Sequence, residues 1–316
     1  MKILLAIPSK NQSQYIGDII DHIGKMSVKP DHVLYFQDRP SAKELVEGKR
    51  LLPTSDGLVE LVVSRSEPEI IGHPQMAYGE SQFLTGHIRE QAIDYMLQNG
   101  YDAVVFIDGD CLPEPELIEA HTAILCKESP VVTVGQRKEF MHEWTDQRLA
   151  PDSKLDIFSD EPREVENEGY FVDSGVVWTC NFGMNRAAVT KLRKLNKLLY
   201  GREETFSSDF AGSWGGEDGF IGLECFYTLT PVIALPKGEN GIKHQFHLRE
   251  SAKYQHVAFI SYLEQRREQL LYLLDCYGFN SRNIRYVPRE ELVKNIVKSM
   301  DYFLSNPGLR APNHPI

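Results

Sequence analysis

Apolar runs alternate with helical patterns along the first 135 residues of the chain. Unbroken apolar runs of about five residues are typical of strands buried on both faces of a parallel sheet. The expected strands are residues 3–7, 33–36, 58–63, 103–107 and 131–134. The expected helices are a first one carrying Ile16, Ile19, Ile20 and Ile23, a second at 82–98, and a third whose first turn holds Pro113 and Pro115. Repeated strand–helix units predict a doubly wound α/β sheet that binds a nucleotide.

The pattern changes after Gly135. Residues 136–170 are polar and lack a clear period, and so long a connection inside an enzyme is typically a lid or an acceptor-binding loop. Beyond it we expect a strand at 174–180, a helix with a basic face at 186–199, a helix at 220–228, and amphipathic helices across 251–305.

Composition narrows the class of protein without identifying it. The chain has 316 residues, of which 42% are hydrophobic and 25% charged, as in soluble globular proteins. A net charge of −11 argues against nucleic-acid binding through general electrostatics. The five cysteines show no Cys-x-x-Cys spacing, which favours a reduced, cytoplasmic setting. The apolar start is too short for a signal peptide, and no apolar run is long enough for a transmembrane segment.

Two carboxylates one residue apart, Asp108 and Asp110, directly follow the apolar run 103–107. At that distance each negative charge raises the pKa of the other, whereas a divalent cation between them keeps both ionised. Ligands of open α/β sheets bind at the carboxyl ends of the strands, where this pair falls. Short acidic pairs also begin ordinary loops, so the pair by itself indicates either a metal–phosphate site or a loop.

A second acidic pair lies in the segment Trp214-Gly215-Gly216-Glu217-Asp218. Glycines let the backbone approach a ligand closely, and either carboxylate is a candidate general base. Because a helix is expected directly afterwards, the pair is equally suited to the favourable end of a helix dipole. The segment is therefore either a catalytic motif or a helix start.

The third candidate is Lys243-His244-Gln245-Phe246-His247, whose pattern predicts a strand. Either histidine is a candidate to complete a metal shell begun by the acidic pair, and both are also compatible with an ordinary polar face.

Taken in order, these segments resemble nucleotide-sugar glycosyltransferases of the GT-A fold. The resemblance is to family-2-type enzymes whose C-terminal part is similar to that of the β-1,4-galactosyltransferases, and it covers residues 1–250. The matching segments are 7–11 (Ile-Pro-Ser-Lys-Asn), 86–90 (Gly-His-Ile-Arg-Glu), 106–113 (Phe-Ile-Asp-Gly-Asp-Cys-Leu-Pro) and 214–218 (Trp-Gly-Gly-Glu-Asp). Glu90 departs from the family, which usually has Asn at that position.

The resemblance implies an α/β fold of the GT-A type, with a mixed, mostly parallel sheet flanked by helices. It assigns 1–250 to the glycosyltransferase domain, with a nucleotide-sugar half at 1–135 and an acceptor half at 136–250. Residues 251–316 are then a C-terminal helical extension.

The resemblance also implies a role for each matching residue. Asp110 would bind Mn²⁺ or Mg²⁺ with His244 or His247, and Asp108 would lie near the ribose and is a further metal ligand. Asp218 would be the catalytic base, and Glu217 would hold sugar or acceptor hydroxyls. The other donor-site residues are Pro8, Asp38, Arg89 and Gly109, and the acceptor-site residues are Trp214, Gly215, Gly216, Arg137 and Trp144.

The implied reaction moves a sugar from a nucleoside-diphosphate sugar, UDP-linked by family default, to an acceptor hydroxyl. A metal neutralises the departing diphosphate, while Asp218 removes the hydroxyl proton from the opposite side, which inverts the anomeric centre. The alternatives are a retaining transferase, a metal-dependent phosphohydrolase or nucleotidyltransferase, and a non-enzymatic sugar-binding module. The donor sugar, hexose or pentose, stays open, as does the acceptor: a saccharide, a lipid-linked sugar, a protein side chain or modified nucleic acid.

Overall fold

The computed structural model describes residues 1–9, 12–38, 48–54, 57–66, 85–139, 170–171, 177, 179–206, 217–228, 230–236, 238 and 240–244. The predicted helical extension at 251–316 lies outside these residues. Of the residues proposed for the acceptor side, Trp144, Trp214, Gly215 and Gly216 lie outside them too, and so does the second histidine, His247.

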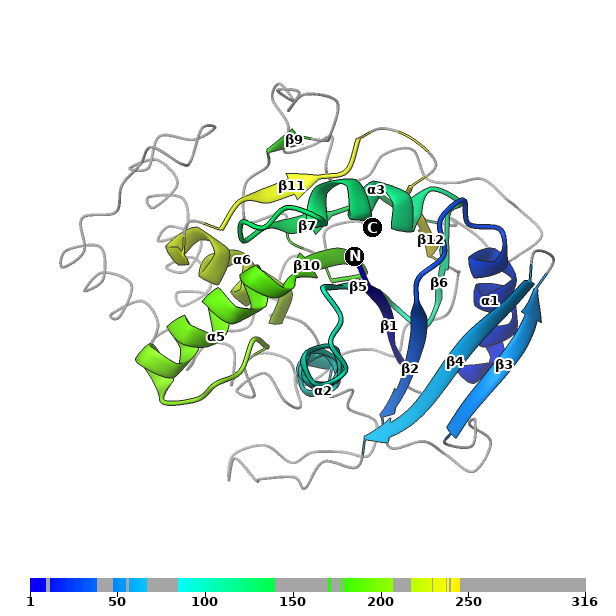
Figure 1. The fold of residues 1–316 in the computed structure, drawn as a ribbon, viewed down its shortest axis with the longest axis horizontal. Coiled ribbons are helices and arrows are strands. Elements are labelled where there is room, and N and C mark those ends of the chain that lie inside the picture. Colours follow the sequence, from blue (N-terminus) through cyan, green and yellow to red (C-terminus); the bar gives the residue numbers. More distant parts are fainter. Residues whose placement is uncertain are drawn as a thin grey trace, which may run out of the picture.

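A mixed sheet forms the centre of the fold (Figure 1). In sheet order its described strands are β3 (Gly48–Thr54), β4 (Gly57–Ser66), β2 (His32–Asp38), β1 (Ile3–Ser9), β5 (Ala103–Ile107), β10 (Asn181–Asn185), β7 (Val132–Val134), β11 (Val232–Ala234) and β9 (Tyr170–Phe171). Strands β4, β2, β1 and β5 are parallel, whereas β10 runs antiparallel to both of its neighbours. The expected mixed, mostly parallel sheet is thereby confirmed.

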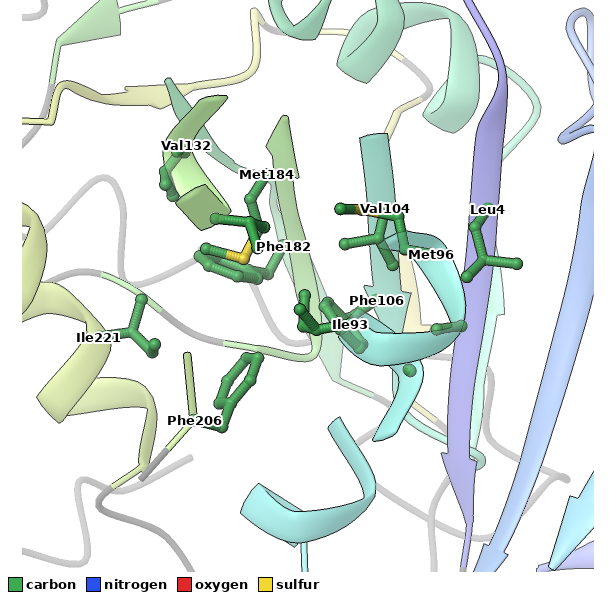
Figure 2. Packing of buried hydrophobic residues seen from close by; sticks show 14 of the residues in the cluster. Leu4, Ile93, Met96, Val104, Phe106, Val132, Phe182, Met184, Phe206 and Ile221 are labelled. Carbon is green, nitrogen blue, oxygen red and sulfur yellow. The ribbon is translucent and has the colours of Figure 1, made fainter. Parts of the chain in front are cut away.

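Helices cover both faces of this sheet. Successive residues of each buried strand point to opposite faces, so each strand contributes apolar side chains to two cores. Leu4 and Ala6 of β1 belong to the core under α2 (Thr85–Gln98), α5 (Arg186–Tyr200) and α6 (Glu217–Thr228), part of which is drawn in Figure 2. Leu5 and Ile7 belong to the core under α1 (Ile16–Gly24) and α3 (Leu117–Leu125). A 3₁₀ turn, η1 (Ser13–Tyr15), precedes α1. In the part of the chain described, no helix combines the length and apolar character that a membrane crossing requires.

A small second sheet consists of β6 (Cys111–Pro113), β12 (Ile242–His244) and β8 (Arg137–Glu139). It shows that the expected helix start was wrong, since Pro113 ends β6 and α3 begins only at Leu117. The expected strand at 174–180 was also wrong at its described residues, because Val177 lies outside any strand, Thr179 and Cys180 form a turn, and the strand is β10. Both ends of β10 are polar residues, Asn181 and Asn185. Their side chains form buried or part-buried hydrogen bonds, which allows them to lie inside the protein.

A buried polar network joins α3 to β7 and β10. The Nδ1 atom of His121 lies 2.7 Å from the hydroxyl of Thr133, and its Nε2 atom lies 2.9 Å from the amide oxygen of Asn181. The amide nitrogen of Asn181 donates to the carbonyl of Gln136, so its oxygen is left to accept from Nε2. One donor and one acceptor describe a neutral imidazole, and burial accordingly lowers the pKa of His121 to about 4.

We expect the free energy of unfolding to fall as pH drops from about 6.5 towards 4. In the unfolded chain His121 binds a proton near pH 6.5, whereas in the native protein its ring stays neutral until about pH 4. Its contribution to the free energy of unfolding is therefore complete above pH 6.5 and is lost as the pH falls from 6.5 towards 4. The difference corresponds to about 3 kcal/mol. Urea unfolding at pH 7, 6 and 5 should show a shallower decline in His121→Gln, and an unaltered slope in that variant would contradict the assignment.

Candidate active site

The first acidic motif forms a tight turn between β5 and β6. The amide of Cys111 donates to the carbonyl of Asp108 over 3.0 Å. A Cβ atom on Gly109 would lie 2.6 Å from the side-chain oxygen of Gln12 and 3.0 Å from Cβ of Ser9. Glycine therefore allows the turn to lie directly against the end of β1. The two carboxylates lie at the carboxyl end of a buried strand, where the sequence places them.

Asp110 is held by two residues that are distant in sequence. Its Oδ2 atom accepts a 2.9 Å hydrogen bond from Nε2 of Gln12 and lies 3.4 Å from Nε2 of His244. His244 reaches this point because β12 pairs antiparallel with β6, in a register that places His244 opposite Cys111. Strand pairing thus brings the predicted acid and the predicted histidine together. Gln12 was not among the predicted site residues, and only the apposition of Gln12 and Asp110 in the fold identifies it.

The donor atoms around this turn suit a divalent cation. Asp108, Asp110 and Cys111 each offer a ligand atom within 4.8 Å of the others. Burial and the neighbouring carboxylates raise the pKa of the Cys111 thiol well above its usual value, and hard divalent cations prefer the two carboxylate oxygens to a thiol. His244 is not one of this group of three and approaches it through Asp110. The 3.4 Å between Asp110 and His244 approaches the roughly 3 Å between adjacent ligands on an octahedral ion with bonds of about 2.1 Å.

The second acidic motif begins helix α6. Glu217 and Asp218 occupy its first turn, as the sequence predicts. Glu217 is buried, and its Oε2 atom has no hydrogen-bond partner among the residues described. Burial and the charge of Asp218 raise the pKa of Glu217 to about 7, against the opposing charge of Arg89. A buried carboxylate oxygen without a donor is suited to receive one from a bound molecule.

Arg89 of α2 joins the two acidic motifs. Its guanidinium donates to Oδ1 of Asp108 over 2.7 Å and to Oε1 of Glu217 over 2.5 Å. The Arg89 side chain is only 3% exposed and that of Asp108 is 30% exposed. Burial opposes the charge on Arg89, but Asp108 and Glu217 outweigh it and raise its pKa. The ends of β5 and α6 therefore lie within the span of one guanidinium.

The remaining predicted residues are less central. Pro8 is buried in β1 opposite Phe36, and Asp38 ends β2, although its side chain lies outside the described part. Arg137, in β8, hydrogen-bonds the thiol of Cys180, whose pKa burial raises to about 11 against the opposing influence of Arg137.

Two cations on the basic face of the helix predicted at 186–199 form ion pairs within the protein. Arg193 pairs with Glu90 and Asp94, and Lys197 pairs with Glu203. These two cations are therefore already neutralised by carboxylates of this chain.

Comparison with known proteins supports the fold alone. No protein-family model and no curated protein sequence matches the chain. TarS 1–349 of S. aureus, solved also in complex with UDP-GlcNAc, superimposes with a TM-score of 0.51 at 15% identity, covering 95% of this chain and 80% of that one. This chain spans about half (50%) of the longer TarS structure. GalNAc-T7 with UDP, GalNAc and Mn²⁺ gives a TM-score of 0.51 at 13% identity over 96% of this chain and 58% of that one. The chain has the mixed, helix-flanked sheet of the GT-A fold.

Proposed function

We propose that the protein is a metal-dependent glycosyltransferase that moves a sugar from a UDP-sugar to an acceptor hydroxyl with inversion. One observation carries the proposal. Arg89 binds both Asp108 and Glu217, so a turn suited to a cation and a pair of candidate acid–base residues lie side by side in a GT-A fold. A metal-dependent phosphohydrolase needs a turn that binds a cation, but it has no use for a second acidic pair beside that turn.

On the donor side, Asp110, His244 and Asp108 would hold Mn²⁺ or Mg²⁺. The ion would neutralise the diphosphate as it leaves the sugar. Gln12 orients the carboxylate of Asp110 through its 2.9 Å hydrogen bond, and Gly109 leaves room for the turn. Pro8 and Asp38, at the ends of β1 and β2, are proposed to border the nucleotide.

On the acceptor side, Asp218 is the better candidate for the base. Glu217 is buried and gives one oxygen to Arg89, whereas Asp218 is only half-buried. Asp218 would take the proton of the attacking hydroxyl, and Oε2 of Glu217 would accept a hydrogen bond from a neighbouring sugar hydroxyl. Trp214, Gly215 and Gly216 directly precede this pair in the sequence and are proposed, with Arg137 and Trp144, to face the acceptor.

We expect one UDP-sugar to raise the melting temperature in the presence of Mn²⁺ and to lose this effect when EDTA is added. A ligand that binds only the folded protein at 100 times its Kd adds about 2.7 kcal/mol of stability. UDP-glucose, UDP-galactose, UDP-GlcNAc and UDP-GalNAc would be compared by thermal shift. His244→Ala should lose the metal-dependent part of the shift while folding normally. A flat melting temperature with every donor and Mn²⁺ would contradict the proposed donor site.

A further inference from the structure

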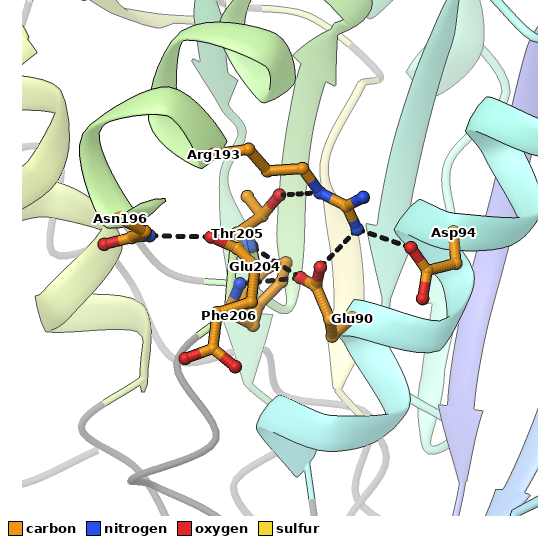
Figure 3. Close-up of polar contacts among 7 residues, drawn as sticks. All are labelled: Glu90, Asp94, Arg193, Asn196, Glu204, Thr205 and Phe206. Atoms are coloured by element: carbon orange, nitrogen blue, oxygen red, sulfur yellow. Dashed lines mark hydrogen bonds and ion pairs between the residues drawn. The ribbon is translucent and has the colours of Figure 1, made fainter. Parts of the chain in front are cut away.

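Glu90, the neighbour of Arg89 on α2, fastens a distant backbone segment to this helix (Figure 3). Its Oε2 atom accepts hydrogen bonds from the backbone amides of Thr205 and Phe206, each over 2.8 Å. Its Oε1 atom pairs with Arg193, which also donates to Asp94 over 2.6 Å. All three groups around Glu90 are therefore donors, and a carboxylate, which only accepts, satisfies them all.

The segment that Glu90 holds is anchored on its other side to β5, the strand that leads into the turn at Asp108–Asp110. Phe206 is fully buried, and its ring packs perpendicular to that of Phe106, with centroids 5.6 Å apart. Phe106 precedes Asp108 by two positions in the chain. Phe206 shares its core cluster with Ile221 of α6, and Figure 2 shows it lying between Ile221 and Phe106.

Consecutive residues of α2 thus hold the two chain segments that flank residues 207–216. Glu90 holds Thr205 and Phe206 before them, and Arg89 holds Glu217 directly after them. Because Arg89 and Glu90 are neighbours on one helix, the two attachments fix the position of Thr205 and Phe206 relative to the start of α6.

We propose that Glu90 is a positioning residue, which sets the place of Glu217 and Asp218 relative to Asp108 and Asp110. The proposal rests on the proposed function. Glu90 acts through the Thr205–Phe206 backbone and touches no reacting atom. These contacts also give a physical reason for a carboxylate at position 90, where the glycosyltransferases that this sequence resembles usually carry Asn. The N–H group of a side-chain amide would face other hydrogen-bond donors there. Misplacing reacting groups by about 1 Å costs on the order of 10²-fold in rate.

The test compares Glu90→Gln with Asp94→Asn in the full chain. Asp94 is a matched control, because it pairs with the same arginine but is not the acceptor for Thr205 or Phe206. Hydrogen exchange would be followed at the amides of 221–225, whose bonds close the first turns of α6. With Mn²⁺ present, two quantities would be measured: the rate at which water hydrolyses UDP-GlcNAc to UDP and GlcNAc, and the Kd for UDP.

In Glu90→Gln we expect amides 205–206 and 221–225 to exchange at least about tenfold faster while those of β1 stay protected. We also expect the hydrolysis of UDP-GlcNAc to slow by about tenfold or more with an unaltered Kd for UDP. Asp94→Asn should resemble the wild type in each measurement. Faster exchange confined to 205–206, or an equal effect in Asp94→Asn, would overturn the proposal. Wild-type protein that neither binds UDP nor hydrolyses UDP-GlcNAc would refute the proposed function, and the exchange at 221–225 would still decide whether Glu90 positions α6.

Discussion

Replacing Asp218 with Asn is expected to abolish sugar transfer while leaving the binding of UDP and Mn²⁺ nearly intact. An amide cannot take the proton of an attacking hydroxyl, and general-base assistance of this kind is worth about 10²–10⁴-fold in rate. The proposed metal ligands Asp110 and His244 come from a turn and a strand outside α6, so they should keep their places. Turnover of the donor identified by thermal shift gives kcat, and calorimetry gives the Kd for UDP with Mn²⁺.

The control for this substitution is Asp18→Asn. Asp18 is likewise an acidic residue in the first turn of a helix, α1, but it is exposed, so its substitution tests the effect of removing a charge from a helix start. It should leave both kcat and Kd unchanged. Loss of UDP binding together with turnover in Asp218→Asn would mean that Asp218 supports the fold, and full turnover would assign the base to another residue.

Replacing Arg89 with Met is expected to lower the free energy of unfolding by about 3–5 kcal/mol, the usual cost of removing one partner from a buried ion pair. The substitution leaves Glu217 buried without its counter-charge and leaves Asp108 without its 2.7 Å donor. Urea denaturation measures the difference. The double variant Arg89→Met with Glu217→Gln should recover part of the loss, because a neutral amide is less costly to bury than an unpaired carboxylate.

Lys197→Met provides the comparison for an exposed ion pair. Lys197 and Glu203 lie at the surface, with side chains 65% and 62% exposed, and water screens such pairs. We expect no measurable change in the urea midpoint. If Arg89→Met proved equally mild, or if the double variant recovered nothing, the Arg89 bridge would not be the buried connection that its contacts indicate.

The central strands could be predicted from sequence because a strand buried on both faces consists mostly of apolar residues, as residues 3–7 of β1 and all of β5 do. Strand β10 could not, since its terminal asparagines are polar and yet buried, their polarity satisfied by hydrogen bonds that only the fold provides. Strands β6 and β8 have three residues each, too few to establish a periodicity. Their existence depends on pairing with β12.

Both acidic motifs of the candidate site could be located from sequence, because carboxylates after a strand and after glycines are unusual enough to notice. Their connection could not be located. Arg89 and Glu217 are separated by 128 positions, and Gln12 and Asp110 by 98. Nothing in the local pattern relates such residues. The role proposed for Glu90 could not be predicted from sequence either, because it depends on hydrogen bonds that Glu90 accepts from the distant backbone amides of Thr205 and Phe206.

The antiparallel strand β10 also has a consequence for the order in which the chain is made. Among the described strands, one edge of β5 pairs with β1 and the other pairs with β10. Asn181 of β10 pairs with Ile107 of β5, so the ribosome adds β10 more than seventy positions after β5. A nascent chain that has emerged only as far as β8 therefore carries an apolar strand with an open hydrogen-bonding edge, the kind of surface on which chains aggregate. Strand β5, which leads into the turn at Asp108–Asp110, is completed only when β10 pairs with it, so residues 103–107 and 181–185 fold together.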